Sequence, residues 1–369
     1  MLILGIETSC DETAAAIVRA ESAGVFPNVD AGLLPEDDPE QLSDHSEGLR
    51  PDCFTVLSNV IASQIDVHKV FGGVVPEIAS RHHLKAINGV IDEAVQKSGV
   101  DRREIDAIAV TKGPGLVGAI LIGLATAKAM AYALKKPLLG VHHIKGHICA
   151  ALIEHPELQP PFLALAVSGG HTSLIEVKEL TGNPGDMIIL GNTRDDAVGE
   201  AYDKVARVLG LGYPGGPKID VLAKDGDSEA AAFKRVMLEE GSLDFSFSGL
   251  KTGVLNYVNN RKQAGLPAHE ADVAAGFQEA VIDVLSAKTK AALKITGCKT
   301  LALVGGVAAN SALRARMQKD AEESGTELYI PSPVYCTDNA AMIACAGYYQ
   351  FKAGAADDLS LDAYATLPL

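Results

Sequence analysis

Apolar and polar residues alternate along the chain in blocks that predict strands followed by helices. Residues 2–8 form a continuous apolar run and residues 14–19 form a second one, with the polar stretch 9–13 between them. Short apolar runs bounded by turn residues predict buried strands, so we expect a β-hairpin here. A similar strand–turn–strand pattern returns at 162–177. Two such hairpins, one early and one in mid-chain, indicate a duplicated architecture.

Helical patterns follow most of the other predicted strands. Further strands are expected over 54–63, 105–111, 137–141, 300–304 and 328–330. Helices are expected over 76–97, 116–134, 144–154, 197–211, 270–295 and 340–351. Strands that alternate with helices are typical of an α/β fold with largely parallel sheets.

The length of the chain predicts two lobes, because single cores stop growing near ~250–300 residues and this chain has 369. We expect a first lobe of residues 1–139 that the closing segment, about 332–369, rejoins. The second lobe is expected over 140–331. The stretch 21–52, which contains an acidic insertion of about 22–52, carries nine acids against one Arg and four prolines, which is typical of a mobile loop.

Composition and charge narrow the classes of function. A hydrophobic share of 47% with 21% charged residues is ordinary for a soluble globular protein. The net charge of −15 argues against a protein that grips nucleic acid by itself, because phosphate binding rests on Lys and Arg. The densest basic cluster of the first third, Arg81, His82, His83 and Lys85, is one place where an RNA backbone could dock.

Cysteine usage and hydropathy predict a cytoplasmic protein. None of the six Cys forms a C-x-x-C pair, so a reducing compartment is expected. The chain opens on a strand pattern without a basic or amphipathic leader. The most apolar run, 116–134, contains Lys128 and small residues, and it indicates a buried core helix and no membrane span.

The segment V-H-H-I-K-G-H at 141–147 carries the first candidate chemistry. If it is helical, His143 and His147 project from one face, and two imidazole nitrogens can reach one metal ion. The preceding strand places the pair at a strand's carboxyl end, where α/β sheets keep their ligands. Asp338 precedes the last predicted helix, and its position alone favours a helix N-cap.

The turns of the two hairpins differ in chemistry. Glu7, Asp11 and Glu12 gather at the first, which fits either a solvated turn or a site for phosphate or a phosphate-bound cation. The second carries Ser168-Gly169-Gly170, where backbone N–H groups can approach a phosphate closely. A Gly-Gly turn after the strand 300–304 could let an adenosine lie on the backbone.

Nine segments, in order along nearly the whole chain, resemble the TsaD family. These segments are G-I-E-T-S-C-D-E-T at 5–13, G-G-V-V-P-E at 72–77, G-P-G-L-V-G at 113–118, V-H-H-I-K-G-H at 141–147, V-S-G-G-H-T at 167–172, Y-P-G-G-P at 213–217, D-F-S-F-S-G-L-K at 244–251, G-G-V-A-A-N at 305–310 and C-T-D-N at 336–339. The family is the bacterial and organellar branch of the tRNA threonylcarbamoyladenosine transferases, formerly labelled O-sialoglycoprotein endopeptidases. It belongs to the actin, Hsp70 and sugar-kinase superfamily. The acidic insertion departs from the family pattern.

The resemblance implies a fold, a reaction and a set of residues. The fold would be α/β, with two RNase-H-like lobes and a nucleotide and metal site in the cleft. The reaction would move the threonylcarbamoyl group of threonylcarbamoyl-AMP to N6 of adenine 37 in tRNAs reading ANN codons, with release of AMP. His143, His147 and Asp338 match the family's metal ligands. The positions that match its substrate-binding residues are Val167, Ser168, Gly169, Gly170, Asp203, Gly216, Asp220 and Asn310.

The resemblance also implies one divalent metal and several partners. Iron is the first expectation, while the His/His/Asp set also suits zinc, and magnesium could bind through water and phosphate. The partners would be tRNA, a smaller paralogous (TsaB-like) subunit and a P-loop (TsaE-like) ATPase. From the residues themselves we hypothesise that Asp11 and Glu12 help to remove the proton or orient the substrate.

Three other functions compete with this interpretation. A zincin protease needs Glu directly after the first His, and Ile144 stands there. A kinase or carbamoyltransferase of the same superfamily would share the turns without requiring the His143/His147/Asp338 set. A non-enzymatic scaffold would be expected to have lost the histidines.

Overall fold

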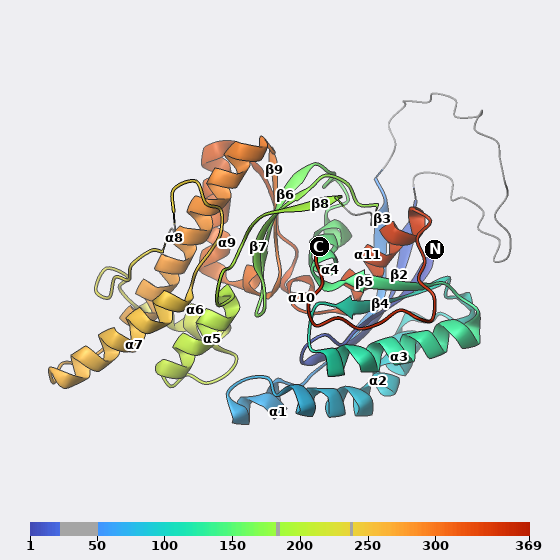
Figure 1. Ribbon diagram of the computed structural model, residues 1–369, viewed down its shortest axis with the longest axis horizontal. Coiled ribbons are helices and arrows are strands. Elements are labelled where there is room, and N and C mark those ends of the chain that lie inside the picture. Colours follow the sequence, from blue (N-terminus) through green and yellow to red (C-terminus); the bar gives the residue numbers. More distant parts are fainter. Residues whose placement is uncertain (23–50, 182–184, 237–238) are drawn as a thin grey trace.

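The computed structural model describes residues 1–22, 51–181, 185–236 and 239–369, so the predicted acidic insertion lies almost wholly outside the described residues. Two lobes lie side by side, each built on a five-stranded sheet with helices on its faces (Figure 1). The expected α/β fold with two lobes is confirmed. Among the described residues, buried side chains form three hydrophobic clusters, one of them between the two sheets.

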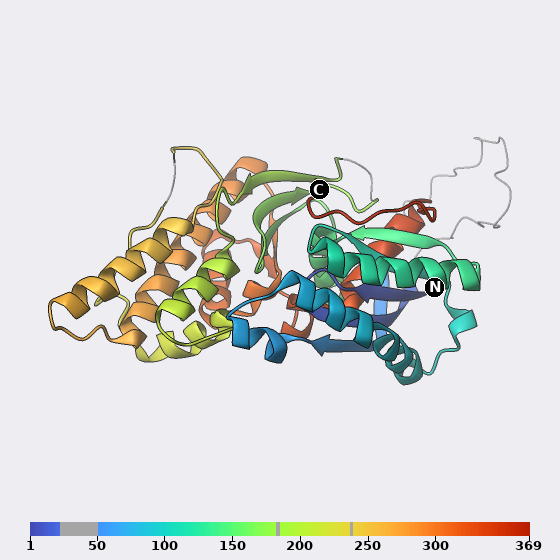
Figure 2. The ribbon, with the colours of Figure 1, turned by 60° about the horizontal axis from the view of Figure 1, so that its bottom comes forward.

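The first sheet has the order β3-β2-β1-β4-β5. Its strands are β1 (Leu2–Glu7), β2 (Glu12–Glu21), β3 (Cys53–Ser63), β4 (Ala107–Gly113) and β5 (Leu138–His142). β1 pairs antiparallel with β2 and parallel with β4, and β5 continues parallel to β4. One face is covered by α2 (Pro76–Ser98) and α3 (Val117–Leu134), and the opposite face by α11 (Ala340–Lys352). In the turned view, α2 and α3 lie in front of the first sheet (Figure 2).

The second sheet has the order β10-β9-β6-β7-β8. Its strands are β6 (Phe162–Val167), β7 (Thr172–Val177), β8 (Met187–Asn192), β9 (Thr300–Val304) and β10 (Glu327–Tyr329). Its helices are α5 (Val198–Val208), α6 (Gly215–Leu222), α7 (Ser248–Gln263), α8 (Glu270–Thr296) and α9 (Ser311–Ser324). The remaining short helices are α1 (Ile65–His68) and α10 (Pro333–Cys336).

The two sheets repeat one topology, which confirms the duplication expected from the hairpins. Read from its other edge, the second sheet is β8-β7-β6-β9-β10, and β6 is antiparallel to β7 and parallel to β9. β6 therefore occupies the place of β1, and β9 that of β4. The two hairpin turns follow the carboxyl ends of β1 and β6. In each lobe a hairpin turn therefore lies at the edge of the sheet where α/β folds bind ligands.

Two helices join the lobes. α4 (His143–Glu154) is almost entirely buried, and it packs against α11 and strands of both sheets. Apolar residues of the two sheets meet these helices in one cluster, which includes Ile3, Ile148, Phe162 and Ile343. β5 belongs to the first sheet up to His142, so it crosses the boundary expected between residues 139 and 140. The other expected limits of the two lobes stay predictions.

The apolar helix α3 is long and apolar enough to cross a membrane, judged by length and composition only. Ala119, Ile120 and Leu124 lie on its buried face, packed toward α2 and β4. Leu121 and Tyr132 are exposed. The expected core helix is therefore confirmed on one face of α3.

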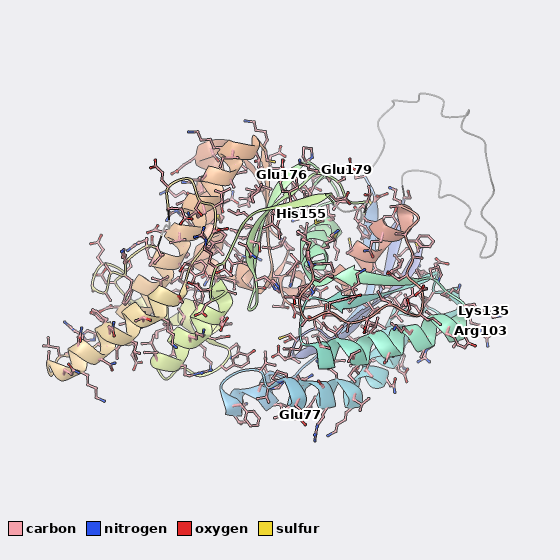
Figure 3. The ribbon with its side chains drawn as sticks, viewed as in Figure 1. Glu77, Arg103, Lys135, His155, Glu176 and Glu179 are labelled. Atoms are coloured by element: carbon pink, nitrogen blue, oxygen red, sulfur yellow. The ribbon has the colours of Figure 1, made fainter. Side chains whose placement is uncertain are left out.

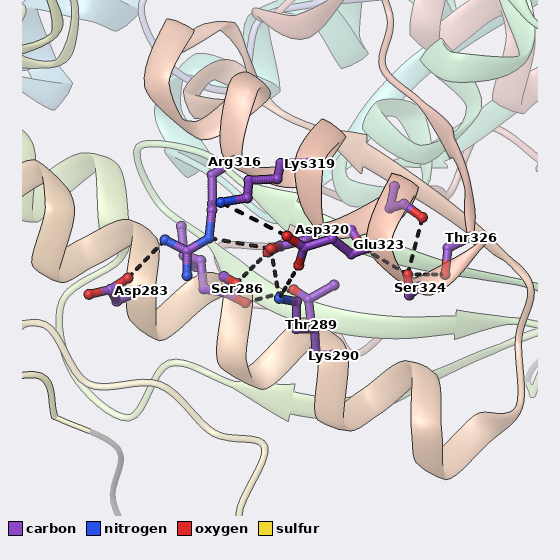
Figure 4. A network of polar contacts seen from close by, with 12 residues as sticks. Asp283, Ser286, Thr289, Lys290, Arg316, Lys319, Asp320, Glu323, Ser324 and Thr326 are labelled. Atoms are coloured by element: carbon purple, nitrogen blue, oxygen red, sulfur yellow. Dashed lines mark hydrogen bonds and ion pairs between the residues drawn. The ribbon is translucent and has the colours of Figure 1, made fainter.

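A polar network ties α8 to α9 in the second lobe (Figure 4). Asp320 is 7% exposed and lies next to Ser286, Lys290 and Arg316, while Arg316 also contacts Asp283. Because hydroxyl and cationic partners surround the buried carboxylate, its desolvation is offset and the pKa of Asp320 is lowered despite its burial. The network fixes α9 behind the turn that follows β9.

Three sequence expectations need correction or extension. β8 was not predicted, because M-I-I-L-G-N at 187–192 lies at a sheet edge with only Met187 and Gly191 buried. Glu12 begins β2 and is not part of the turn. His83 is buried, with Nδ1 2.8 Å from Thr13 Oγ1 and Nε2 3.0 Å from the Cys10 carbonyl oxygen, so it does not belong to an exposed basic face for RNA.

Candidate functional site

The two histidines of 141–147 lie at the junction of β5 and α4. β5 ends at His142, whose Nδ1 accepts a hydrogen bond from the Ile144 N–H at 3.2 Å and caps the helix. α4 begins at His143, so His143 and His147 stand one turn apart, 6% and 1% exposed. Their ring centroids are 4.7 Å apart. The helix predicted from the sequence thus places both imidazoles on one buried face.

Asp338 completes the cluster from the other side. Its Oδ1 lies 3.2 Å from His147 Nε2 and 3.6 Å from His143 Nε2. The N-cap of α11 is Asn339, whose Oδ1 accepts the Met342 N–H at 3.0 Å. The alternative that Asp338 caps the helix is therefore wrong, and its carboxylate faces the two histidines.

The three side chains fit one divalent metal ion. Candidate ligand atoms of His143, His147 and Asp338 all lie within 4.8 Å of one another. The buried Nδ1 of His147 lacks a hydrogen-bond partner, and its Nε2 faces the Asp338 carboxylate; a buried polar group left unpaired is costly unless something binds it. Two imidazole nitrogens and one carboxylate oxygen are a three-ligand set that leaves coordination positions open for substrate.

Electrostatics hold this cluster in a charged form. Burial disfavours the imidazolium of His143, yet the nearby Asp338 and Glu7 outweigh burial and raise its pKa to about 9. Burial likewise opposes the charge of Asp338, but the charge of His143 and the close contact with His147 lower its pKa. In the metal-free protein His143 therefore carries an extra proton at neutral pH, and a metal ion that binds His143 must displace this proton.

The residues hypothesised as catalytic lie between the lobes and next to each other. Asp11 is 5% exposed and accepts a hydrogen bond from the Tyr213 hydroxyl at 3.3 Å. Glu12 accepts one from Ser63 Oγ at 3.2 Å. Burial, with the negative charges of Asp338 and Asp11, raises the pKa of Glu12 well above its usual range. Glu12 therefore holds its proton near neutral pH and can donate a hydrogen bond, but it cannot act as a base in this state.

The turn predicted to hold the adenylate lies against two other elements. Val167 ends β6, and Ser168, Gly169 and Gly170 form the turn into β7. The Gly199 N–H at the start of α5 donates to the Ser168 carbonyl oxygen at 3.2 Å. Gly305 after β9 has φ +93°, and a Cβ there would lie 2.4 Å from the Val167 carbonyl oxygen. Only glycine fits this approach, so the structure brings both Gly-rich turns together.

The remaining predicted substrate residues lie on the helices around this turn. Asp203 of α5 accepts the Gly215 N–H at 2.6 Å, which fixes the start of α6 and Gly216 beside it. Asp220 of α6 accepts both the N–H and the hydroxyl of Ser311, at 3.0 Å each. Asn310, the residue before Ser311, caps α9 and donates to Gln278 Oε1 at 2.8 Å. These hydrogen bonds join α5, α6 and α9 around one edge of the second sheet.

Two contacts between the lobes were not predicted. One is the hydrogen bond from Tyr213 to Asp11, and the other joins the Arg207 guanidinium to the Gly72 carbonyl oxygen. The sequence held only an unspecific hint of these contacts: Gly72 and Tyr213 belong to the Gly-rich motifs at 72–77 and 213–217, which do not reveal their partners. They place the acidic hairpin against the turn before α6, and the segment before α2 against α5.

Comparisons with known proteins show the family to which the chain is similar. The model of the family described as TsaD, tRNA N6-adenosine threonylcarbamoyltransferase, matches residues 55–345. A curated relative of that name from Moorella thermoacetica is 50% identical over all of this chain and 97% of its own length. One from Clostridioides difficile is 49% identical over all of this chain and 98% of its own.

The solved structures show the fold alone. Full-length HypF, bound to phosphate and nucleotide, aligns with a TM-score of 0.56 at 13% identity, over 95% of this chain. The chain spans only 46% of that HypF. HypF from T. kodakarensis aligns at 0.53 and 15% identity, over 73% of this chain and 43% of its own. At such low identity these likenesses bear on the two-lobed architecture and not on chemistry.

Proposed function

Because the chain belongs to the tRNA N6-adenosine threonylcarbamoyltransferase family, we propose that His143, His147 and Asp338 hold a divalent metal ion that serves the transfer. The protein is an enzyme that modifies N6 of adenosine in tRNA. The observation that supports the metal is the three-residue cluster, whose candidate ligand atoms lie within 4.8 Å of one another and in which the buried His147 Nδ1 lacks a hydrogen-bond partner. The competing kinase, protease and scaffold functions have no support among these relatives.

The acyl donor in this proposal is threonylcarbamoyl-AMP, and the acceptor is adenine 37 of tRNAs reading ANN codons. The N6 nitrogen forms a bond to the carbamoyl carbon, the bond from that carbon to the phosphate oxygen breaks, N6 loses a proton and AMP leaves. A bound divalent metal would supply Lewis-acid polarisation of the donor. Iron is the first expectation, with zinc and magnesium as the alternatives.

The chain's own residues would hold and orient the substrate. The backbone of Ser168, Gly169 and Gly170 is open to a phosphate, since a Cβ on either glycine would meet no atom within 4 Å. Further residues of the second lobe surround that turn: Val167, Asp203, Gly216, Asp220 and Asn310. From the first lobe Asp11 would accept the proton or hydrogen bond of the attacking amine, and protonated Glu12 would donate one.

The metal proposal is tested by His147→Ala. Purified protein would be reconstituted with Fe²⁺ or Zn²⁺, and bound metal and transfer from threonylcarbamoyl-AMP to unmodified tRNA would be measured, the product by nucleoside mass spectrometry. We expect loss of bound metal and at least a roughly hundredfold loss of transfer. His155→Ala is the matched control, since His155 is the C-cap of the same helix, outside the cluster. Full metal binding by His147→Ala contradicts the proposal.

The roles of Asp11 and Glu12 are tested by single alanine substitutions. Each is expected to reduce transfer while bound metal stays at the wild-type level, since neither belongs to the ligand set. Undiminished transfer by either variant would remove that residue from the mechanism.

We also propose the partners and compartment implied by the family. A smaller paralogous subunit and a P-loop ATPase would complete the active assembly, and transfer assays with and without them would show whether the isolated chain suffices. All six cysteines are free and none pairs in a disulfide in the described part of the chain, which supports a reducing, cytoplasmic environment.

A further inference from the structure

Glu7 is a fully buried carboxylate at the end of β1, beside the proposed metal ligands. Its side chain is 0% exposed. Its Oε1 accepts the Ser9 N–H at 2.5 Å, and its Oε2 accepts the Thr111 hydroxyl at 2.6 Å. The same Oε2 lies 3.0 Å from His143 Nδ1. Both oxygens therefore have partners from β4, α4 and the first hairpin turn.

Burying such a carboxylate carries a large desolvation cost unless it is paired and hydrogen-bonded. Among the described residues the ion-pair partner of Glu7 is His143, and no Lys or Arg makes a salt bridge to it. A carboxylate that serves only the packing of β1 would be replaceable by an apolar residue. Its placement makes sense if the orientation of His143 matters.

We propose that Glu7 is the positioning residue that prepares His143 as a metal ligand. By accepting the Nδ1–H, Glu7 fixes the tautomer in which Nε2 carries the free lone pair. Nε2 is also the atom nearest Asp338, 3.6 Å from its Oδ1. A carboxylate that accepts the second N–H of a ligating imidazole fixes the ring and raises its basicity.

The contrast with His147 shows why Glu7 should matter most for the affinity of this site. His147 Nδ1 has no hydrogen-bond partner, so no residue holds this ring from the side away from Asp338. His143 is held through Glu7 by Thr111 and Ser9, which connect it to β4 and to the first hairpin turn. One of the two imidazoles is thus preorganised, and removal of its partner should weaken the whole site.

This inference rests on the proposed metal site, and its test separates the two. Glu7→Gln, Glu7→Asp and wild-type protein would be stripped of metal, and Zn²⁺ affinity would be measured by competition with a chromophoric chelator. For Glu7→Gln we expect a rise in Kd of roughly ten- to a hundredfold, and an altered visible spectrum of the Co²⁺ form. Glu7→Asp keeps the charge and should recover part of the affinity.

Asp320→Asn is the matched control, because Asp320 is another buried carboxylate hydrogen-bonded to a hydroxyl but lies in the network of the second lobe. It should lower thermal stability without changing the Zn²⁺ Kd or the Co²⁺ spectrum. If Glu7→Gln does not fold, Thr111→Val, which removes one donor to Glu7, should still raise the Kd.

The outcomes are distinct. Wild-type protein that binds no metal refutes the proposed metal site itself. Wild-type protein that binds Zn²⁺, with Glu7→Gln or Thr111→Val binding it equally well and giving the same Co²⁺ spectrum, overturns the positioning role of Glu7 alone.

Discussion

At the scale of single residues, the candidate site is a relay of hydrogen bonds and charges that crosses the first sheet. It starts at Thr111, passes through Glu7 to His143, and ends at Asp338. Every member of this relay is buried or nearly so. In such surroundings charges interact strongly, so the protonation of His143 is coupled both to folding and to metal binding.

The pH dependence of the metal-free protein follows from His143. Its pKa in the folded state is about 9, above the usual 6.5, so its contribution to stability is fully present below pH 6.5 and is lost as pH rises through 9. The difference amounts to about 3 kcal/mol. Urea unfolding at pH 6.5 and pH 9 should show this loss in the wild-type protein, whereas His143→Gln should show a smaller one.

Tyr213 is expected to support Asp11 across the two lobes. Tyr213→Phe removes the hydroxyl that donates to Asp11, and a lost hydrogen bond of about 1 kcal/mol predicts roughly a fivefold loss of transfer. The assay is single-turnover product formation. Tyr257→Phe serves as the control, since its hydroxyl donates to the Ala230 carbonyl oxygen on the exposed side of the second lobe. Equal rates for both variants would contradict a role for the Tyr213–Asp11 contact.

The sequence predicted some of these residues and concealed others, for physical reasons. His143 and His147 were visible because four-residue spacing on a helix has a single geometric meaning. The position of Asp338, taken by itself, favoured a helix N-cap, because Asp and Asn are nearly equal N-caps and Asn339 follows it. Only the family resemblance pointed to Asp338 as a metal ligand. The role of Glu7 was not visible, since its partner His143 is 136 positions away.

At the scale of elements, α11 directly follows Asp338 and its N-cap Asn339, and the close approach of this helix to β1 depends on Gly5. A Cβ on Gly5 would lie 2.1 Å from the Ala340 carbonyl oxygen and 3.0 Å from the Ala344 nitrogen. Both are backbone atoms of α11, so the helix must move to admit a methyl group. Strand hydrophobicity predicted β1, but this fit of helix on strand arises only in three dimensions.

Gly5→Ala is therefore expected to displace α11, to destabilise the fold by about 1–3 kcal/mol and to weaken Zn²⁺ binding through Asp338. Thermal unfolding and chelator competition would measure the two effects. Gly89→Ala is the control, because Gly89 lies in α2 and a Cβ there meets nothing within 4 Å. That substitution should stabilise the protein by up to ~1 kcal/mol, since Ala favours helix over Gly. If Gly5→Ala kept the stability and the Zn²⁺ affinity of the wild type, α11 would be able to move away from β1 without cost, which contradicts this prediction.

The edge strand β8 was the strand that the sequence did not predict. β8 packs only part of one face and has Ile188 and Ile189 exposed, so its apolar run resembles neither a buried strand nor an alternating one. The central strands β1, β4, β6 and β9 are buried almost throughout and were predicted within about two residues. Periodicity reports burial, and where burial is partial the sequence signal fades.

At the scale of the whole molecule, the duplicated lobes bring the His143/His147/Asp338 cluster and two Gly-rich turns into one region, while the chain carries a net charge of −15. In Figure 3, Arg103 and Lys135 lie at the outer end of the first lobe, away from the second. His83, once expected on a basic face, is buried. Because phosphate binding rests on Lys and Arg, the acidity of this chain predicts that tRNA binding draws on a partner.

We therefore predict that the isolated chain binds tRNA weakly at physiological salt, with a Kd in the range of nonspecific binding, about 1–100 µM. Fluorescence anisotropy of labelled unmodified tRNA would measure it, over a series of salt concentrations. Because few phosphates would be neutralised, the slope of log K against log salt should be shallow, and it should steepen when the proposed partner subunits are added. Nanomolar binding by the chain alone would mean that this acidic molecule presents a local basic surface strong enough to hold tRNA without help.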